Sequence, residues 1–121
     1  MIEQIELNFF EISTIQCALE NFKNKMLIEQ NERMLFQIEI LQRRFNNYEL
    51  SYNQNYDEPR IVVLSNINEN IIDKALIQEI DRLSNNFIEI INNVGVEMFV
   101  DAYNEVFNIK DKLQIAYTNI D

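Results

Sequence analysis

Residues 2–26 read IEQIELNFFEISTIQCALENFKNKM, and this stretch decides the fold class. Its apolar side chains recur every three or four positions, at Ile2, Ile5, Phe9, Ile12, Ile15, Leu19, Phe22 and Met26. That spacing predicts an amphipathic helix, because it places these side chains on one face. A strand is the open alternative at the start, where Ile5, Leu7 and Phe9 alternate with polar residues. A capping box at Ser13–Gln16 would then begin the helix. The helix accounts for more positions, and we prefer it.

The composition favours long helices and excludes much enzyme chemistry. The chain of 121 residues has one glycine, one proline and no histidine, and 47% of it is hydrophobic. Without histidine there is no serine or cysteine triad and no His-containing zinc or di-iron site. A single glycine excludes the glycine-rich loops that bind nucleotide phosphates. We therefore expect no enzyme activity, no cofactor and no metal. The lone Cys17 is read as a small residue beside the core rather than a reactive thiol.

A second apolar stripe follows the first, at Met34, Ile38, Leu41, Phe45, Tyr48 and Tyr52. It is shifted by one position, so residues 2–52 form either two helices with a break near 29–33 or one helix. A single helix would be about 75 Å long and would need a partner to cover it. We favour the break. Residues 53–60 are predicted to be a loop, because Pro59 ends any helix before it.

The rest of the chain predicts one further strand-like segment and two helices. Residues 61–64 are β-branched and short, and form either a strand or a buried extended segment. Helical spacing covers 68–94 and stops at Gly95, which is typical of a helix end, and covers 96–118 after it. The sequence thus predicts an all-α fold, a single domain over residues 1–121. Its architecture is an antiparallel bundle of three or four amphipathic helices.

The charge of the chain bears on its partners. Twenty acidic against ten basic residues give a net charge of −10. Such a chain is repelled by nucleic acid and by anionic membranes, so we expect neither as a direct partner. Without a signal-peptide pattern or a long apolar run, a cytoplasmic protein is expected. The pair Arg43–Arg44 is too small a basic patch for nucleic acid, and Arg43 is more simply the partner of Glu39.

An acidic stretch is the first candidate for a binding site. No basic residue lies between Arg82 and Lys110, and the carboxylates in that interval include Glu89, Glu97, Asp101 and Glu105. The last three are spaced four apart, where like charges destabilise a helix by a few tenths of a kcal/mol per pair, on the order of 0.2–0.5. A basic protein surface would offset that cost. A solvated acidic face is the simpler alternative, and a hard cation is a further one.

A tyrosine series is the second candidate. Tyr48, Tyr52 and Tyr56 follow one another at helical spacing, interleaved with asparagines. Tyrosine combines a large contact area with a polar tip, which suits a protein interface. The alternative is that the three side chains cap the core of the bundle.

At the level of class, the chain resembles the small acidic proteins of phages and mobile elements, among them anti-CRISPR proteins and nuclease immunity proteins. The resemblance lies in size, acidity and the heavy use of asparagine and isoleucine, and it covers no motif. It implies a non-enzymatic inhibitor that occupies a basic surface of a nucleic-acid-handling enzyme. The alternative is a homo-oligomeric structural or adaptor protein, a homodimer for example, that pairs through the stripe around Met34 and Ile38.

Overall fold

The computed structural model describes residues 2–52, 56 and 58–118, with side chains for 4–52, 56 and 58–113. These residues contain two strands and five helices. In chain order they are β1 (Ile2–Leu7), α1 (Phe9–Ile28), α2 (Glu32–Leu50), β2 (Arg60–Ser65), α3 (Asn66–Asn85), α4 (Phe87–Val94) and α5 (Val96–Thr118). The fold is mostly helical, as the sequence predicts, and adds a small sheet that the preferred interpretation did not contain.

The helix predicted from residue 2 is wrong over its first turns, because residues 2–7 form a strand. β1 pairs antiparallel with β2, with Ile5 opposite Val62. The alternation of Ile5 and Leu7 places both side chains in the core. The helix begins only after Asn8, whose side chain accepts a hydrogen bond from the Glu11 backbone N–H in a capping box. A strand needs a partner strand for its backbone hydrogen bonds, and β2, far away in sequence, supplies it here.

Residues 61–64 accordingly lie within a true strand, which extends from Arg60 to Ser65. Both strands of this two-stranded ribbon are edge strands. On each of them, a cationic side chain donates a hydrogen bond to a backbone carbonyl. Arg44 donates to the Val63 carbonyl, and Lys112 Nζ donates to the Glu6 carbonyl at 3.1 Å. Residues 53–55 and 57 of the predicted loop lie outside the described residues.

The break predicted near 29–33 is confirmed. α1 ends at Ile28 and α2 begins at Glu32, and Gln30 between them has a φ of 57°. This left-handed conformation is costly for residues other than glycine. Here it reverses the direction of the chain at a position that has no glycine. Asn31 then caps α2 by accepting a hydrogen bond from the Met34 backbone N–H at 3.2 Å.

The predicted helix over 68–94 is two helices. α3 begins earlier, at Asn66, because Ser65 and Asn68 form a capping box. It ends where the backbone leaves helical geometry at Asn86, whose side chain donates to the Arg82 carbonyl at 2.8 Å. Gly95, with a φ of 90°, ends α4 as predicted. α5 then covers the predicted range 96–118.

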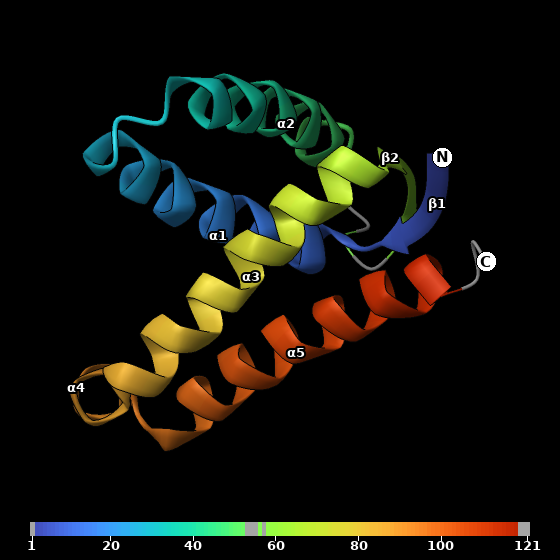
Figure 1. Cartoon of the computed structure of the whole chain (residues 1–121). Coiled ribbons are helices and arrows are strands. Elements are labelled where there is room, and N and C mark those ends of the chain that lie inside the picture. Colours follow the sequence, from blue (N-terminus) through green and yellow to red (C-terminus); the bar gives the residue numbers. More distant parts are fainter. Residues whose placement is uncertain (1, 53–55, 57, 119–121) are drawn as a thin grey trace.

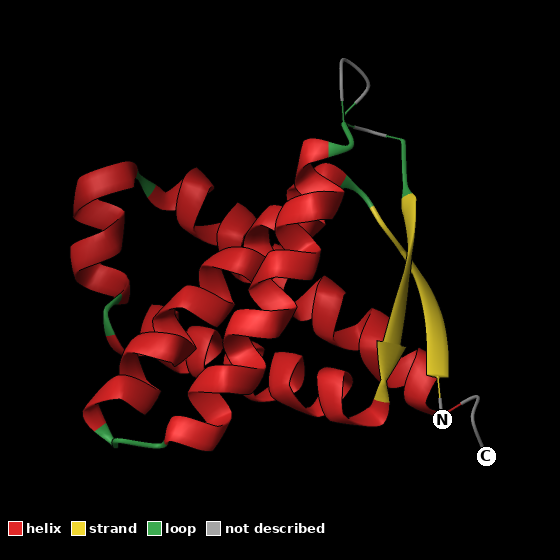
Figure 2. Ribbon diagram, turned by 90° about the horizontal axis from the view of Figure 1, so that it is seen from above, coloured by secondary structure: helices red, strands yellow, loops and turns green. Residues whose placement is uncertain are grey.

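The helices form two hairpin-like pairs that cross (Figure 1). α1 packs against α2, α3 crosses α1, and α5 lies beside α3. The ribbon lies at one end and α4 at the opposite end, as Figure 2 also shows. The largest fully buried side chains come from both pairs and from the ribbon: Phe45, Leu7, Ile12, Ile15, Leu19, Ile38, Leu41, Leu64, Ile72, Leu76, Ile109 and Val62. This arrangement is compatible with a helical bundle. Within the described part of the chain, none of the helices is both long and apolar enough to span a bilayer.

Candidate protein-interaction site

The three tyrosines do not form an exposed ladder. Tyr52 is buried, and its hydroxyl donates to the Leu7 carbonyl at 3.1 Å. Tyr48 is half-buried, with its ring 6.1 Å from that of Phe45. Only Tyr56 is exposed, with its ring 4.8 Å from Phe9. The expectation of exposed anchors is therefore wrong for Tyr52, which ties the end of α2 to the ribbon.

Tyr52→Phe is expected to lower the free energy of unfolding by about 1–2 kcal/mol, because the buried Leu7 carbonyl loses its donor. Burial also raises the pKa of the Tyr52 hydroxyl, so this group stays protonated and donating at neutral pH. Urea unfolding of the variant measures the loss. Tyr56→Phe is the control at an exposed tyrosine, and an equal loss in both variants would contradict the assignment.

The four predicted carboxylates separate into two environments. Glu89 on α4 and Glu97 and Asp101 on α5 are exposed. Glu105 is half-buried, because the helical spacing turns it toward the packed side of α5. Burial raises the pKa of the Glu105 carboxyl, the charge of Glu11 raises it further, and Lys112 acts in the opposite direction. Glu105 thus belongs to the packing of α5 more than to a surface for a partner.

Glu105→Gln is expected to stabilise the protein at neutral pH. The raised pKa means that the folded protein binds the Glu105 proton more tightly than the unfolded chain. The stability that this tighter proton binding gives the folded state is fully present at pH values below 4.5, the ordinary pKa of the carboxyl. It is lost as the pH rises through the raised pKa. Urea unfolding at pH values on both sides of this window should show a gain for the variant only at the higher pH. Glu97→Gln, at an exposed carboxylate, should show no such pH-dependent gain.

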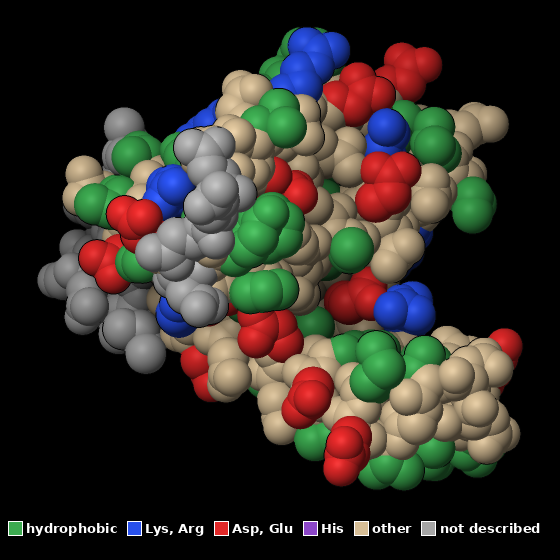
Figure 3. All heavy atoms as spheres, turned by 180° about the vertical axis from the view of Figure 1, so that it is seen from behind, with side chains coloured by type: hydrophobic (Ala, Val, Ile, Leu, Met, Phe, Trp, Pro, Cys, Tyr) green, Lys and Arg blue, Asp and Glu red, His purple; other side chains and the backbone are tan. Residues whose placement is uncertain are grey.

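Apolar side chains are exposed on the same two helices as the exposed carboxylates. α4 has no buried residue. Large apolar side chains are exposed on α4 and on the first half of α5, at Phe87, Ile88, Val94, Val96, Met98 and Val100. Figure 3, in which α4 lies at the lower right, shows hydrophobic and acidic side chains on the projecting part of the molecule. We call these six residues, with Glu89, Glu97 and Asp101, the α4–α5 face.

Sequence reasoning missed the apolar half of this face. Phe87, Ile91 and Val94 continue the helical spacing over 68–94, which predicts one helix there. The break at Asn86 turns α4 out of line with α3, and only Ile90 and Ile91 of its apolar residues become half-buried. The sequence does indicate this exposed surface, because residues 87–100 contain more apolar residues than one buried helical stripe requires.

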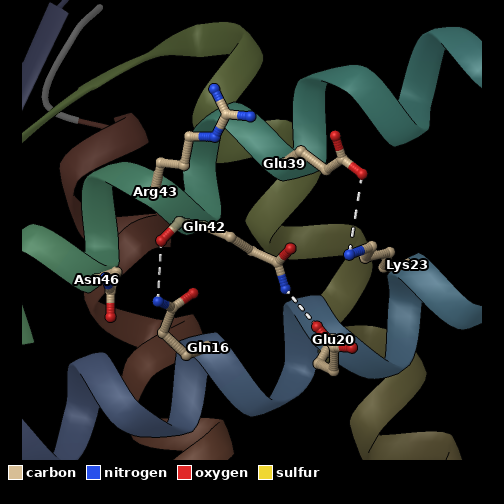
Figure 4. A pocket seen from close by; sticks show the side chains of 7 residues that line it. All are labelled: Gln16, Glu20, Lys23, Glu39, Gln42, Arg43 and Asn46. Carbon is tan, nitrogen blue, oxygen red and sulfur yellow. Dashed lines mark hydrogen bonds and ion pairs between the residues drawn. The ribbon is translucent and has the colours of Figure 1, made fainter.

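A second surface feature, a polar groove of about 540 Å³, lies between α1 and α2 (Figure 4). Seven residues line it: Gln16, Glu20, Lys23, Glu39, Gln42, Arg43 and Asn46. Gln16 Nε2 donates to the Gln42 carbonyl at 3.0 Å, and Gln42 Nε2 donates to Glu20 Oε2 at 2.8 Å. Most of these side chains are joined to one another across the two helices, while Gln16 Oε1 is buried without a hydrogen-bond partner.

The expected pair of Glu39 and Arg43 is not formed. Glu39 pairs instead with Lys23 of α1, at 3.9 Å, and the Arg43 side chain extends away from it (Figure 4). Arg44 is used within the fold, since it donates to Asn68 Oδ1 and to the ribbon. Cys17 is exposed on α1 rather than packed beside the core. In the part of the chain with described side chains, no cluster of three or more His, Cys, Asp or Glu could hold a metal ion.

Comparison with models of protein families, with curated proteins and with solved structures finds no match to this chain.

Proposed function

We propose that this protein is a non-enzymatic interaction module that binds a basic, partly apolar protein surface through its α4–α5 face. One observation carries the proposal: six large apolar side chains and three carboxylates are exposed on α4 and the first half of α5, within fifteen consecutive residues from Phe87 to Asp101. The sequence has no basic residue between Arg82 and Lys110 to neutralise them. Large exposed apolar patches with a polar rim are typical of protein-binding surfaces.

The partner that suits this surface is a nucleic-acid-handling enzyme. Such enzymes expose basic grooves for phosphates, and carboxylates at helical spacing would stand in for those phosphates. The apolar side chains would supply the contact area that charge alone lacks. Occupation of the groove would exclude the nucleic acid and inhibit the enzyme, as the class-level resemblance to anti-CRISPR and immunity proteins implies.

The test compares two triple variants of equal net charge as baits in a host lysate. Glu89→Gln/Glu97→Gln/Asp101→Gln neutralises the α4–α5 face, and Glu6→Gln/Glu29→Gln/Glu32→Gln neutralises three exposed carboxylates elsewhere. The wild type and the second variant are expected to capture a basic nucleic-acid enzyme and inhibit it. The first variant should bind it at least about tenfold more weakly, and high salt should weaken all binding. Equal capture and inhibition by both variants would exclude the α4–α5 face.

Homo-oligomerisation remains the second candidate, but not through the stripe predicted for it. Ile38 is fully buried and Met34 half-buried in the protein's own core. Self-association would have to use exposed apolar residues such as those of the α4–α5 face. It would then bring carboxylates close to carboxylates, so salt would strengthen it, whereas salt weakens binding to a basic partner. Molar mass measured at low and high salt separates the two.

A further inference from the structure

α5 carries a second apolar stripe, of which only Tyr103 packs against the core and the other members are exposed. It consists of Val96, Val100, Tyr103 and Phe107, and we call it the α5 stripe. At 100° per residue it lies roughly a third of a turn from the buried stripe of Val106, Ile109 and Leu113. Val96 is 59% exposed, Val100 43% and Phe107 37%, and Tyr103 is half-buried.

Aromatic contacts and α3 order the second half of the α5 stripe, at Tyr103 and Phe107. The rings of Tyr103 and Phe107 lie 4.9 Å apart, and those of Phe99 and Tyr103 lie 5.8 Å apart. The Tyr103 hydroxyl lies 3.4 Å from Ser84 Oγ of α3. These contacts hold Tyr103 and Phe107 in place before any partner binds, which lowers the entropy cost of binding at this half of the stripe.

The spacing of the α5 stripe matches that of a helix-pairing seam. Successive members are four, three and four residues apart, the a/d pattern through which two helices pack side by side. The stripe extends over the twelve residues from Val96 to Phe107, about 16 Å along the helix axis, which is close to three turns. This is the form in which a helical segment is recognised, by anchors on successive turns.

The charges beside the α5 stripe select the occupant. Glu97 and Asp111 are both exposed. They flank the α5 stripe on its solvent side, one near each end. Lys110, on the other flank, is already paired with Asp73 of α3 at 3.3 Å. A helix with basic flanks would therefore be attracted, and a second copy of this chain would oppose acid to acid.

We infer that the α5 stripe binds an amphipathic helix of the partner, with apolar residues on one face and lysines or arginines beside them. This inference rests on the proposed function and specifies the element of the partner that is recognised. The partner's helix lies along α5, with its apolar side chains between Val100 and Phe107 and its cations near Glu97 and Asp111.

The test uses two synthetic helical peptides with leucine at the seam positions. One has lysine and the other glutamate at the flanking positions, and binding to the full-length protein is measured by fluorescence anisotropy. The lysine peptide is expected to bind at least about tenfold more tightly than the glutamate peptide. Val100→Asn/Phe107→Asn should reduce that binding at least about tenfold. The control Ile61→Asn/Ile67→Asn, at residues exposed on β2 and α3, should leave it unchanged.

Three results of the peptide test would overturn the inference: no binding of the lysine peptide, equal binding of both peptides, or unchanged binding by a folded Val100→Asn/Phe107→Asn variant. Dimerisation of the wild type that this variant abolishes would also overturn it, because a second copy would then be the occupant. If the stripe variant still captures and inhibits the enzyme while the triple glutamine variant does not, the inference fails and the proposed function stands. If the triple glutamine variant captures the enzyme normally, the proposed function itself fails.

Discussion

Phe45→Ala is expected to lower the free energy of unfolding by about 3–5 kcal/mol, the largest effect predicted for this protein. Phe45 is fully buried, and its ring contacts Tyr48 on the same helix. Its removal deletes the transfer free energy of the ring and leaves a cavity between α2 and the rest of the core. Since domains of this size have total stabilities of roughly 5–15 kcal/mol, the variant would lose a large share.

The matched control is Phe36→Ala, on the same helix. Phe36 is 66% exposed, so its truncation is expected to change stability by no more than about 0.5 kcal/mol. Guanidinium unfolding followed by circular dichroism measures both variants. Similar losses in the two would contradict the burial of Phe45 in the core.

Lys112→Met is expected to lower the free energy of unfolding by about 2–3 kcal/mol, because Lys112 joins three elements through charge-assisted hydrogen bonds. From α5, its ammonium lies 2.7 and 2.8 Å from the two carboxylate oxygens of Glu11 in α1. It also donates to the Glu6 carbonyl of β1. The Glu11 side chain is only 8% exposed, so loss of Lys112 leaves a nearly buried carboxylate without its cation. The expected loss is smaller than for a fully buried pair, because Lys112 itself is 43% exposed and water partly replaces it.

Lys110→Met tests the same chemistry two residues away. Lys110 pairs with Asp73 at 3.3 Å, and the Asp73 side chain is 39% exposed. Such a pair contributes at most about 1 kcal/mol, so this variant should remain close to the wild type. In Lys112→Met, the pKa of Glu105 should also rise further, since Lys112 is the charge that lowers it. A loss of stability in Lys110→Met equal to that in Lys112→Met would show that the contacts to Glu11 and Glu6 add nothing.

Much of the helical architecture could be predicted from the sequence. The spacing around Ile12, Ile15 and Leu19 is helical over many turns, and these residues are fully buried on α1. Gly95 marks a helix end, because its φ of 90° favours glycine. The reversal near Gln30 could be located only by a shift in phase, since a residue other than glycine adopts the left-handed conformation there.

The candidate site was predictable only in part. The absence of basic residues between Arg82 and Lys110 predicted where the negative charge of the site lies. Glu89, Glu97 and Asp101 in this interval are exposed, as a binding surface requires. The environment of Glu105 was not predictable, because Glu11 and Lys112 reach it from distant positions in the sequence. Tyr52 was predicted to lie at an interface because it follows Tyr48 at helical spacing. Its hydroxyl instead donates a hydrogen bond to a backbone carbonyl of β1, which is distant in the sequence.

By itself, the sequence determined that the chain is acidic, mostly helical and without the side chains of histidine-dependent catalysis, because these properties follow from composition and local periodicity. Only the tertiary structure decided that residues 2–7 pair with β2, since a strand is stabilised by hydrogen bonds to a partner that local sequence does not contain. It also decided which apolar stripes are covered. α5 has two such stripes, and α3 and α1 can bury only one of them, so Val96, Val100 and Phe107 remain exposed to solvent.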